Sequence, residues 1–265
     1  MSQRPDPSTT MRAGGATDAI ERPRRRWLVP LLLAGLVVGG AVAAYAAVEQ
    51  AAPATGDRAA VEAIVRDYIL AHPEIIPEAM DRLREKKLAQ AVQENRTALE
   101  TPYRGAWEGA AQPDVTLVAF MDYACGYCRA SLPDIDRLVR EDPKLRVVYH
   151  ELPIIADGSL GAARVSLLAA DSGHFKQFHT AMYAAGNVEP ESVVRAAREA
   201  GIDAARARTA LQSDGADETL MANVRLAQAL QVQGTPLFVV GDQVLTGAVG
   251  YDRLKAAIAK ARGAS

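Results

Sequence analysis

Cysteine is scarce in this sequence. Its 265 residues include two cysteines, Cys125 and Cys128, and four histidines. A structural zinc site needs about four ligands. Neither a second cysteine pair nor histidines at a matching spacing accompany the two cysteines, so the sequence excludes such a site. A charge excess is also lacking, because 30 basic residues face 32 acidic ones, for a net charge of −2. Such a chain has no electrostatic footprint for nucleic acid.

Both cysteines stand in VTLVAFMDYACGYCR, residues 115–129, between an apolar β-branched run and a helix-compatible stretch. A strand that delivers Cys125 to the first turn of a helix places its sulfur beside unpaired backbone N–H groups, which favours the thiolate. We therefore predict a redox site in which Cys125 attacks and Cys128, deeper and one turn later, closes the disulfide. Gly126 and Tyr127 between them add no charge. A purely structural disulfide closing so short a loop would constrain the unfolded chain little.

The N-terminal part of the sequence predicts export. Residues 1–26 are expected to be a disordered basic tail, and residues 27–48 contain no charge and match the roughly 20 apolar residues that cross a bilayer. Arginines stand directly before residue 27, so we predict a transmembrane signal-anchor with the tail in the cytoplasm and the chain from Glu49 in the periplasm. The alternative is a secretory signal cleaved after Ala46, which would leave a soluble periplasmic protein. In both cases the cysteines reach a compartment where disulfides persist.

A helical module is predicted over residues 57–104. Its first helix starts with Asp57 as N-cap and is interrupted before Pro73, because the residue preceding proline is pushed out of the α region. Its second helix covers about Pro77–Glu100, with irregular apolar spacing. Helices this polar, lying outside the main domain, cannot bury a core alone. We expect them to self-associate or to serve as a spacer between the membrane and the main domain.

The main domain, residues 113–265, is predicted to be α/β. Strands at Val115–Met121 and Leu145–Glu151 flank a helix over Cys125–Arg140, which makes a βαβ unit. A helical insertion, about residues 159–232, then separates these strands from the rest of the sheet. The remaining predicted elements are two strands of a hairpin, Pro236–Val240 and Gln243–Leu245, and a closing helix, Tyr251–Ala261.

This order of elements resembles the DsbA-like thiol:disulfide oxidoreductases, which have a thioredoxin fold with an inserted helical subdomain. The resemblance rests on Phe120–Cys128, similar to the family's active-site segment, and on Gly234-Thr235-Pro236, similar to its cis-proline loop. It implies that Pro236 faces the cysteine pair and that the backbone at Thr235 and Pro236 binds the extended chain of a substrate. It implies no cofactor, since the electrons reside on the sulfur pair.

Two further resemblances concern the kind of oxidoreductase. The segment Val61–Lys87 is similar to the N-terminal module of the ScsC-like subgroup (suppressor of copper sensitivity), which serves oligomerisation there. The dipeptide Gly126-Tyr127 and the threonine before Pro236 resemble disulfide isomerases more than strongly oxidising enzymes, which typically have Pro-His between the cysteines. The absence of that histidine implies a less oxidising couple.

The sequence departs from the thioredoxin pattern at one position. Many enzymes of this fold bury an acid six residues before the first cysteine, as a proton acceptor for the resolving thiol, and this chain has Ala119 there. We interpret Asp122, three residues before Cys125, as a cap or loop residue. Glu151 is a weaker candidate for the missing acid, and the histidines are interpreted as packing or surface residues.

Together these observations predict a periplasmic enzyme that exchanges disulfides with exported cysteine-containing proteins, as an oxidase or an isomerase. Its expected partners are these substrates, an inner-membrane redox protein that reoxidises or reduces the dithiol, and further copies of the chain. Two alternatives stay open. The dithiol could carry copper(I) in copper tolerance, although a metal carrier does not require Thr235-Pro236, or the chain could be a membrane-tethered scaffold.

Overall fold

The computed structural model describes residues 55–215, 217–232 and 234–263. The predicted tail and membrane anchor, residues 1–26 and 27–48, lie outside this part. Among the described residues, no helix combines the length and the apolar character needed to cross a membrane. The chain divides into two compact units, one ending at His72 and the other beginning at Pro73.

Helix α2, Thr55–Ala71, is the described part of the first unit. Asp57 lies in its first turn and not at the predicted N-cap. The helix ends before Pro73 as predicted, with the backbone N–H of His72 donating to Tyr68 at 2.9 Å. Apolar side chains project from it into solvent, and Ile64 and Leu70 are each 68% exposed. Among the described residues, nothing covers this apolar surface of α2.

The second unit is built on a five-stranded mixed sheet in the order β1-β3-β2-β4-β5. Strands β2 and β3 are parallel, and every other neighbouring pair is antiparallel. Strand β1 was not predicted, because its three residues are too few to show an apolar alternation, and the sheet therefore begins before Pro113. The hairpin between β4 and β5 is confirmed, with Val240 opposite Gln243. The strands are β1 (Trp107–Gly109), β2 (Val115–Met121), β3 (Leu145–Glu151), β4 (Leu237–Val240) and β5 (Gln243–Thr246).

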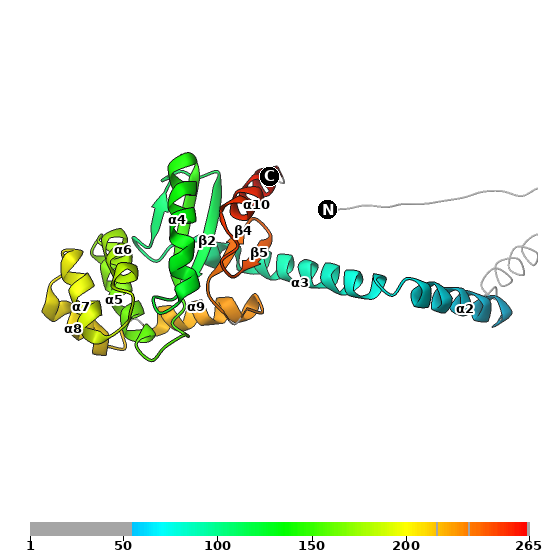
Figure 1. Ribbon diagram of the computed structural model, residues 1–265, viewed down its shortest axis with the longest axis horizontal. Helices are drawn as coiled ribbons and strands as arrows, with labels where there is room; N and C mark the ends of the chain where they lie inside the picture. Colours follow the sequence, from blue (N-terminus) through cyan, green and yellow to red (C-terminus); the bar gives the residue numbers. More distant parts are fainter. Residues whose placement is uncertain (1–54, 216, 233, 264–265) are drawn as a thin grey trace, which may run out of the picture. The chain divides into compact units, whose positions relative to one another are not determined.

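Helices cover both faces of this sheet (Figure 1). Helices α4 and α10 pack on one face, and α9 and the end of α3 pack on the other. The predicted helical insertion is confirmed: α5 to α8 pack on one another, and α6 reaches β1. The helices of this unit are α3 (Ile75–Glu100), α4 (Gly126–Glu141), α5 (Ser159–Asp171), α6 (Phe175–Ala185), α7 (Pro190–Glu199), α8 (Ala204–Gln212), α9 (Asp217–Ala229) and α10 (Tyr251–Gly263).

Strand β2 shows why both faces need cover. Its side chains alternate between two apolar clusters: Leu117 and Ala119 join the cluster under α4 and α10, whereas Val118 and Phe120 join the cluster on the opposite face. A central strand that is apolar on both sides is typical of a sheet sandwiched between helices. The strand that leads to the cysteines is thus buried at every residue except Thr116.

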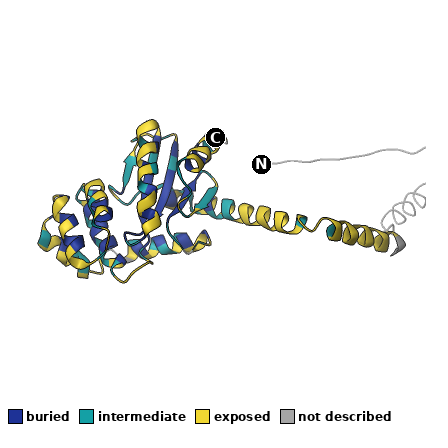
Figure 2. Ribbon diagram, in the orientation of Figure 1, coloured by how far each residue is buried: buried dark blue, intermediate teal, exposed yellow. Residues whose placement is uncertain are grey.

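Helix α3 belongs to the main domain at one end and is exposed at the other (Figure 2). Val92 and Leu99 are 1% and 0% exposed and lie in the same apolar cluster as Phe120. The prediction that both helices lie outside the main domain is therefore wrong for the last turns of α3. These turns cover a face of the sheet that would otherwise be exposed to solvent. Near its start, by contrast, Met80 and Leu83 are exposed.

Candidate active site

Cys125 is the N-cap residue of α4, in an extended conformation with φ −83° and ψ 115°. A turn after β2, closed by a hydrogen bond from the backbone N–H of Cys125 to the carbonyl oxygen of Asp122 at 3.0 Å, brings it there. Its Sγ accepts the backbone N–H of Cys128 at 3.3 Å. This bond uses one of the unpaired donors of the first helical turn. The predicted passage from strand to cysteine to helix is confirmed.

The Thr235–Pro236 peptide bond is cis, as the family resemblance implies. Strand β4 follows it directly and pairs with β2, with Leu237 opposite Phe120. This pairing carries the loop to the start of α4, where the Cys125 thiol lies 3.3 Å from the carbonyl oxygen of Thr235. The structure therefore brings together the cysteine and the proline loop, which are about a hundred residues apart in the sequence.

Cys128 is fully buried one turn into α4. Burial raises the pKa of its thiol, while the backbone at Asp122 and the hydroxyl group of Thr235 act in the opposite direction. The Oγ1 atom of Thr235 is itself buried beside this thiol and has no other hydrogen-bond partner among the described residues. A hydroxyl without another partner beside a thiol is a ready donor for a thiolate. Of the two residues between the cysteines, Gly126 has open space around it and the Tyr127 side chain is 70% exposed.

Asp122 organises the loops around the cysteines. Its Oδ1 accepts hydrogen bonds from the backbone N–H of Ala124 at 2.8 Å and the hydroxyl of Ser159 at 2.7 Å. Its Oδ2 accepts the backbone N–H groups of Ile154 and Ile155, both at 2.8 Å. All four donors come from the two loops that follow β2 and β3, or from the start of α5. This geometry agrees with the interpretation of Asp122 as a loop residue, whereas the cap of α4 is Cys125.

Glu151, at the end of β3, belongs to a buried polar network. Its Oε1 accepts hydrogen bonds from the Tyr123 hydroxyl at 3.0 Å and from the Ser166 hydroxyl at 2.7 Å. The Tyr123 oxygen also lies 3.1 Å from Nδ1 of His179. Burial raises the pKa of Glu151 to about 8, and the two hydroxyl groups oppose this rise. Burial raises the pKa of Tyr183 as well, and the charges of Cys128 and Glu151 raise it further, so this ring lies near both groups.

Glu151 lies on the strand next to the alanine at residue 119. In the parallel pair of β2 and β3, Ala119 lies opposite Tyr149 and Met121 lies opposite Glu151. The buried Glu151 is thus at the carboxyl edge of the sheet, where both strands end. This signal was present in the sequence, because polar residues that end two adjacent parallel strands meet at one edge of the sheet. Sequence reasoning missed the rest of the network, which α5 and α6 supply.

The histidines have structural surroundings. His150 lies between the carbonyl oxygen of Leu99, 2.8 Å from its Nε2, and the side chain of Asn223. His174 precedes α6, and His179 is buried inside it. Within the described ranges, no three His, Cys, Asp or Glu side chains are grouped so that they could hold a metal ion. The copper(I) alternative would therefore rest on the two thiols alone.

Family models match two parts of the chain. The DSBA-like thioredoxin domain matches residues 116–259, which include both cysteines and Thr235-Pro236. The copper resistance protein ScsC N-terminal domain matches residues 57–90, which span α2 and the first half of α3. The ScsC match ends at residue 90, just before Val92, the first buried residue of α3. The end of this match therefore agrees with the change in burial along the helix.

Solved structures and a curated relative extend the comparison. A linker-deletion mutant of Proteus mirabilis ScsC has a TM-score of 0.66 and 26% identity, over 82% of this chain and 100% of that one. A thioredoxin-like oxidoreductase from Silicibacter pomeroyi has a TM-score of 0.61 and 36% identity, over 64% and 99% of the two chains.

A Na(+)/H(+) antiporter, NhaA 1 of Salinispora arenicola, is 27% identical over 163 residues. That alignment covers 60% of this chain and 25% of the antiporter, so the chain spans a quarter of that relative's length. The domain match over residues 116–259, the cysteine pair and the cis-proline loop carry the assignment. The chain belongs to the DSBA-like thioredoxin-domain family of thiol-disulfide oxidoreductases and has a ScsC-type N-terminal segment.

Proposed function

We propose that this enzyme exchanges disulfides with exported proteins in the periplasm, through Cys125 as the attacking sulfur and Cys128 as the resolving one. The observation that carries the proposal is the position of the Cys125 sulfur, at the N-cap of α4 and 3.3 Å from the carbonyl oxygen of Thr235. There the sulfur faces the cis-proline loop, whose backbone suits an extended substrate chain.

The exchange balances in sulfur, electrons and protons. In the reducing direction the Cys125 thiolate attacks a substrate disulfide, forms a mixed disulfide and releases one substrate thiolate. Cys128 then loses its proton and attacks the Cys125 sulfur, which closes the enzyme disulfide and releases the second substrate thiolate. In the oxidising direction each step runs backwards. In isomerisation the released substrate thiolate, or another one, attacks the mixed disulfide before Cys128 does, so that the enzyme leaves unchanged.

The hydroxyl of Thr235 supports the step at Cys128. Burial disfavours the Cys128 thiolate that the oxidising direction must release as leaving group. Thr235 Oγ1, buried and without another described partner, can donate to this thiolate at the moment when it forms. Thr235 therefore takes part in the proposed site through both its carbonyl oxygen and its side chain.

Two variants test the roles of the cysteines. Cys128→Ser is expected to accumulate mixed disulfides with exported proteins, because the resolving sulfur is gone. Cys125→Ser is expected to abolish the reduction of insulin disulfides under metal-free conditions. Diagonal electrophoresis of cell extracts measures the first and a turbidity assay measures the second. Mixed disulfides trapped by Cys125→Ser, or equal alkylation rates of both thiols in the reduced protein, would contradict the assignment.

We also propose that α2 and the exposed part of α3 associate with further copies of the chain, which favours isomerase activity. Several active sites around one misfolded substrate raise the effective concentration of thiol. Support comes from the exposed apolar side chains of both helices and from the match to the ScsC N-terminal domain. Removing residues 49–84, which spares the buried Val92, is expected to leave dithiol oxidation intact and to weaken the unscrambling of disulfides. A truncated protein that unscrambles as well as the intact one would reduce the segment to a spacer.

For the N-terminal region we propose that residues 27–48 anchor the chain in the inner membrane. There it would lie beside a membrane protein that reoxidises or reduces the dithiol. The uncharged run and the arginines before it support this arrangement. A reporter that is active only after export should work when it is fused after Glu49. Recovery of a mature chain that begins near Ala47 in the soluble periplasmic fraction would replace the anchor with a cleaved signal.

A further inference from the structure

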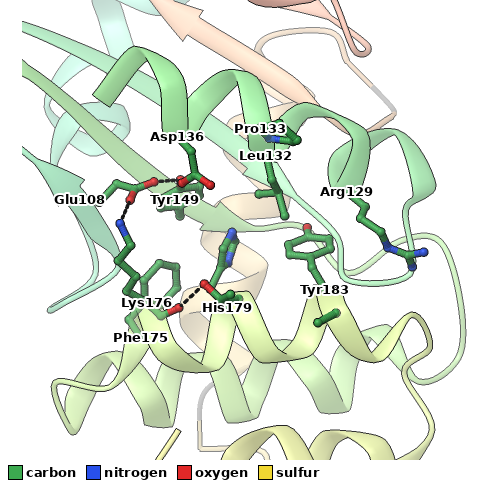
Figure 3. Close-up of a pocket in the computed structure, with 12 residues that line it drawn as sticks. Glu108, Arg129, Leu132, Pro133, Asp136, Tyr149, Phe175, Lys176, His179 and Tyr183 are labelled. Atoms are coloured by element: carbon green, nitrogen blue, oxygen red, sulfur yellow. Dashed lines mark hydrogen bonds and ion pairs between the residues drawn. The ribbon is translucent and has the colours of Figure 1, made fainter. Parts of the chain in front are cut away.

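A cavity of about 270 Å³ lies between α4 and α6 (Figure 3). Neither cysteine lines it. Its walls are largely aromatic, with the rings of Tyr149, Phe175 and Tyr183, and Leu132 of α4 lies opposite them. Its volume is near the lower end of small-ligand pockets, roughly 300–1,000 Å³. A cavity of this size fits a group as large as one long side chain.

His179 supplies a buried polar atom without a partner. The residue is 7% exposed and lines the cavity, with its ring pointing into the space between the helices (Figure 3). Its Nε2 makes no hydrogen bond to any described residue. Buried ring nitrogens are normally paired, and one left unpaired points to a missing ligand. The other nitrogen, Nδ1, is engaged in the core by Tyr123.

The contact between His179 and Tyr123 decides whether Nε2 of His179 is a hydrogen-bond donor or an acceptor. Tyr123 has a single hydroxyl hydrogen, and two groups other than His179 contact its oxygen, Ser166 at 2.8 Å and Glu151 at 3.0 Å. We assign the hydrogen to these two acceptors. Nδ1 of His179 must then be the donor in its 3.1 Å contact with the Tyr123 oxygen. Burial lowers the pKa of His179 to about 4, so the ring is neutral near pH 7 and carries one hydrogen, on Nδ1. Nε2 therefore presents a lone pair to the cavity, which suits a ligand with N–H groups.

Asp136 supplies an uncommitted negative charge at the rim. Among the described residues its carboxylate makes no hydrogen bond or ion pair. The neighbouring charged side chains, by contrast, each have a hydrogen-bond or ion-pair partner. Glu108 accepts a hydrogen bond from Tyr149 and pairs with Lys176 at 2.7 Å. The guanidinium group of Arg129 donates to the carbonyl oxygen of Gly186 at 3.1 Å. Burial raises the pKa of Asp136 and the charge of Glu108 raises it further, while the charges of Lys176 and Arg140 lower it. The net rise shows that the surroundings disfavour the carboxylate, which an added cation would stabilise.

We propose that this cavity binds a small organic cation, an alkylammonium or alkylguanidinium group. Its N–H groups would bind Nε2 of His179 and the carboxylate of Asp136, and its apolar stem would lie among the three aromatic rings. Cations are attracted to the faces of such rings. The cation is either a free amine or guanidine or the Lys or Arg side chain of a bound protein. The inference stands apart from the thiol chemistry, because it uses neither sulfur.

Titration of the full-length protein with butylguanidinium, followed by calorimetry, tests this inference. We expect saturable binding that is at least tenfold tighter than that of pentanamide, a neutral molecule of similar length, and of butyrate. Asp136→Asn should weaken butylguanidinium binding roughly fivefold, as expected for a half-exposed ion pair. Asp134→Asn, two residues away on α4 and outside the cavity, should leave it unchanged. His179→Phe, which keeps a ring in place, should weaken binding roughly tenfold through the lost acceptor.

A second arm distinguishes the source of the cation. A short peptide with one arginine is compared with the same peptide with citrulline, which has the shape without the charge. Much tighter binding of the arginine peptide than of butylguanidinium would assign the site to a partner protein, and similar binding would assign it to a free metabolite. Both outcomes support the inference. Equal binding of pentanamide, or equal effects of Asp136→Asn and Asp134→Asn, would overturn it even if His179→Phe fails to fold.

Discussion

The active-site end of the sheet and the ScsC-type helices are opposites in what they bury. Around the cysteines, polar side chains lie in the core: Asp122 is 1% exposed and Glu151 is 3% exposed. Along α2 and the start of α3, apolar side chains lie in solvent. Figure 2 colours most of these two segments as exposed. In the first region both of these buried carboxyl groups accept hydrogen bonds, and those of Asp122 hold the loops around the sulfur. In the second region the apolar groups have no described cover.

The two regions differ in the free-energy cost that their side chains carry: buried polar groups in one and exposed apolar groups in the other. A buried carboxylate is tolerated only when its hydrogen bonds are complete, so the geometry around it is rigid and specific. An exposed apolar stripe costs little for the isolated chain and gains energy only when another surface covers it. The site region should therefore respond to substitution through folding stability, and the helices should respond through association.

The largest effect is expected from breaking the polar region at Asp122. Asp122→Ala leaves the backbone N–H groups of Ala124, Ile154 and Ile155 without their acceptor, and should lower the free energy of unfolding by about 3–5 kcal/mol. Urea denaturation of the full-length protein measures this. The matched control Asp134→Ala, on the outer part of α4, should change it by less than about 0.5 kcal/mol. A loss below about 1 kcal/mol for Asp122→Ala would mean that these loops are held by other contacts.

A smaller effect, with a defined pH dependence, is expected at Glu151. Burial raises the pKa of Glu151 from 4.5 to about 8 in the folded state. Between these values the folded carboxyl group holds a proton that the unfolded one has lost, so stability falls as the pH rises through this window. Glu151→Gln stays neutral at every pH. Its stability relative to wild type should improve by about 2–4 kcal/mol between pH 5 and pH 9. Parallel stability curves for the two proteins would show that Glu151 is ionised in the fold.

The smallest effect on stability is expected in the helices. Ile64→Ser with Tyr68→Ser, one turn apart on the same face of α2, should change the free energy of unfolding of the second unit by less than about 0.5 kcal/mol, because both side chains are exposed. The same double variant should sediment as a smaller species than wild type at tens of micromolar. Arg66→Ser on the same helix serves as the control. If wild type and double variant sediment alike, the apolar stripe of α2 is not an association surface.

Patterns within short segments predicted most of the fold. The apolar run of β2, the cysteine spacing and the breaks between the inserted helices are local signals, and each element they predict is present. Strand β1 was missed because three residues show no period. The burial of Val92 and Leu99 was missed because α3 is highly charged, and only the sheet face beneath it explains their burial.

Two parts of the candidate site were predictable from the sequence, the cysteine pair and the proline loop. Their residue types alone indicate the chemistry. A buried acid near the site was harder to place, because Ala119 occupies the position expected for it and Glu151 is buried on the neighbouring strand. The cavity between α4 and α6 had no sequence signal. His179 and Asp136 are forty-odd residues apart, and nothing in either segment indicates that the helices face each other.

The continuity of α3 has a geometric consequence for any assembly. Met80 and Leu83 point outward from the same rigid helix whose later residues, Val92 and Leu99, are fixed in the core. Each residue of an α-helix turns the chain by about 100° and advances it by about 1.5 Å. One residue inserted between Leu83 and Val92 would swing the outward stripe by over a quarter-turn relative to the cysteines, whereas seven would restore it to within about 20°. The number of residues along α3 between Leu83 and Val92 thus sets the direction in which each active site faces relative to the exposed stripe.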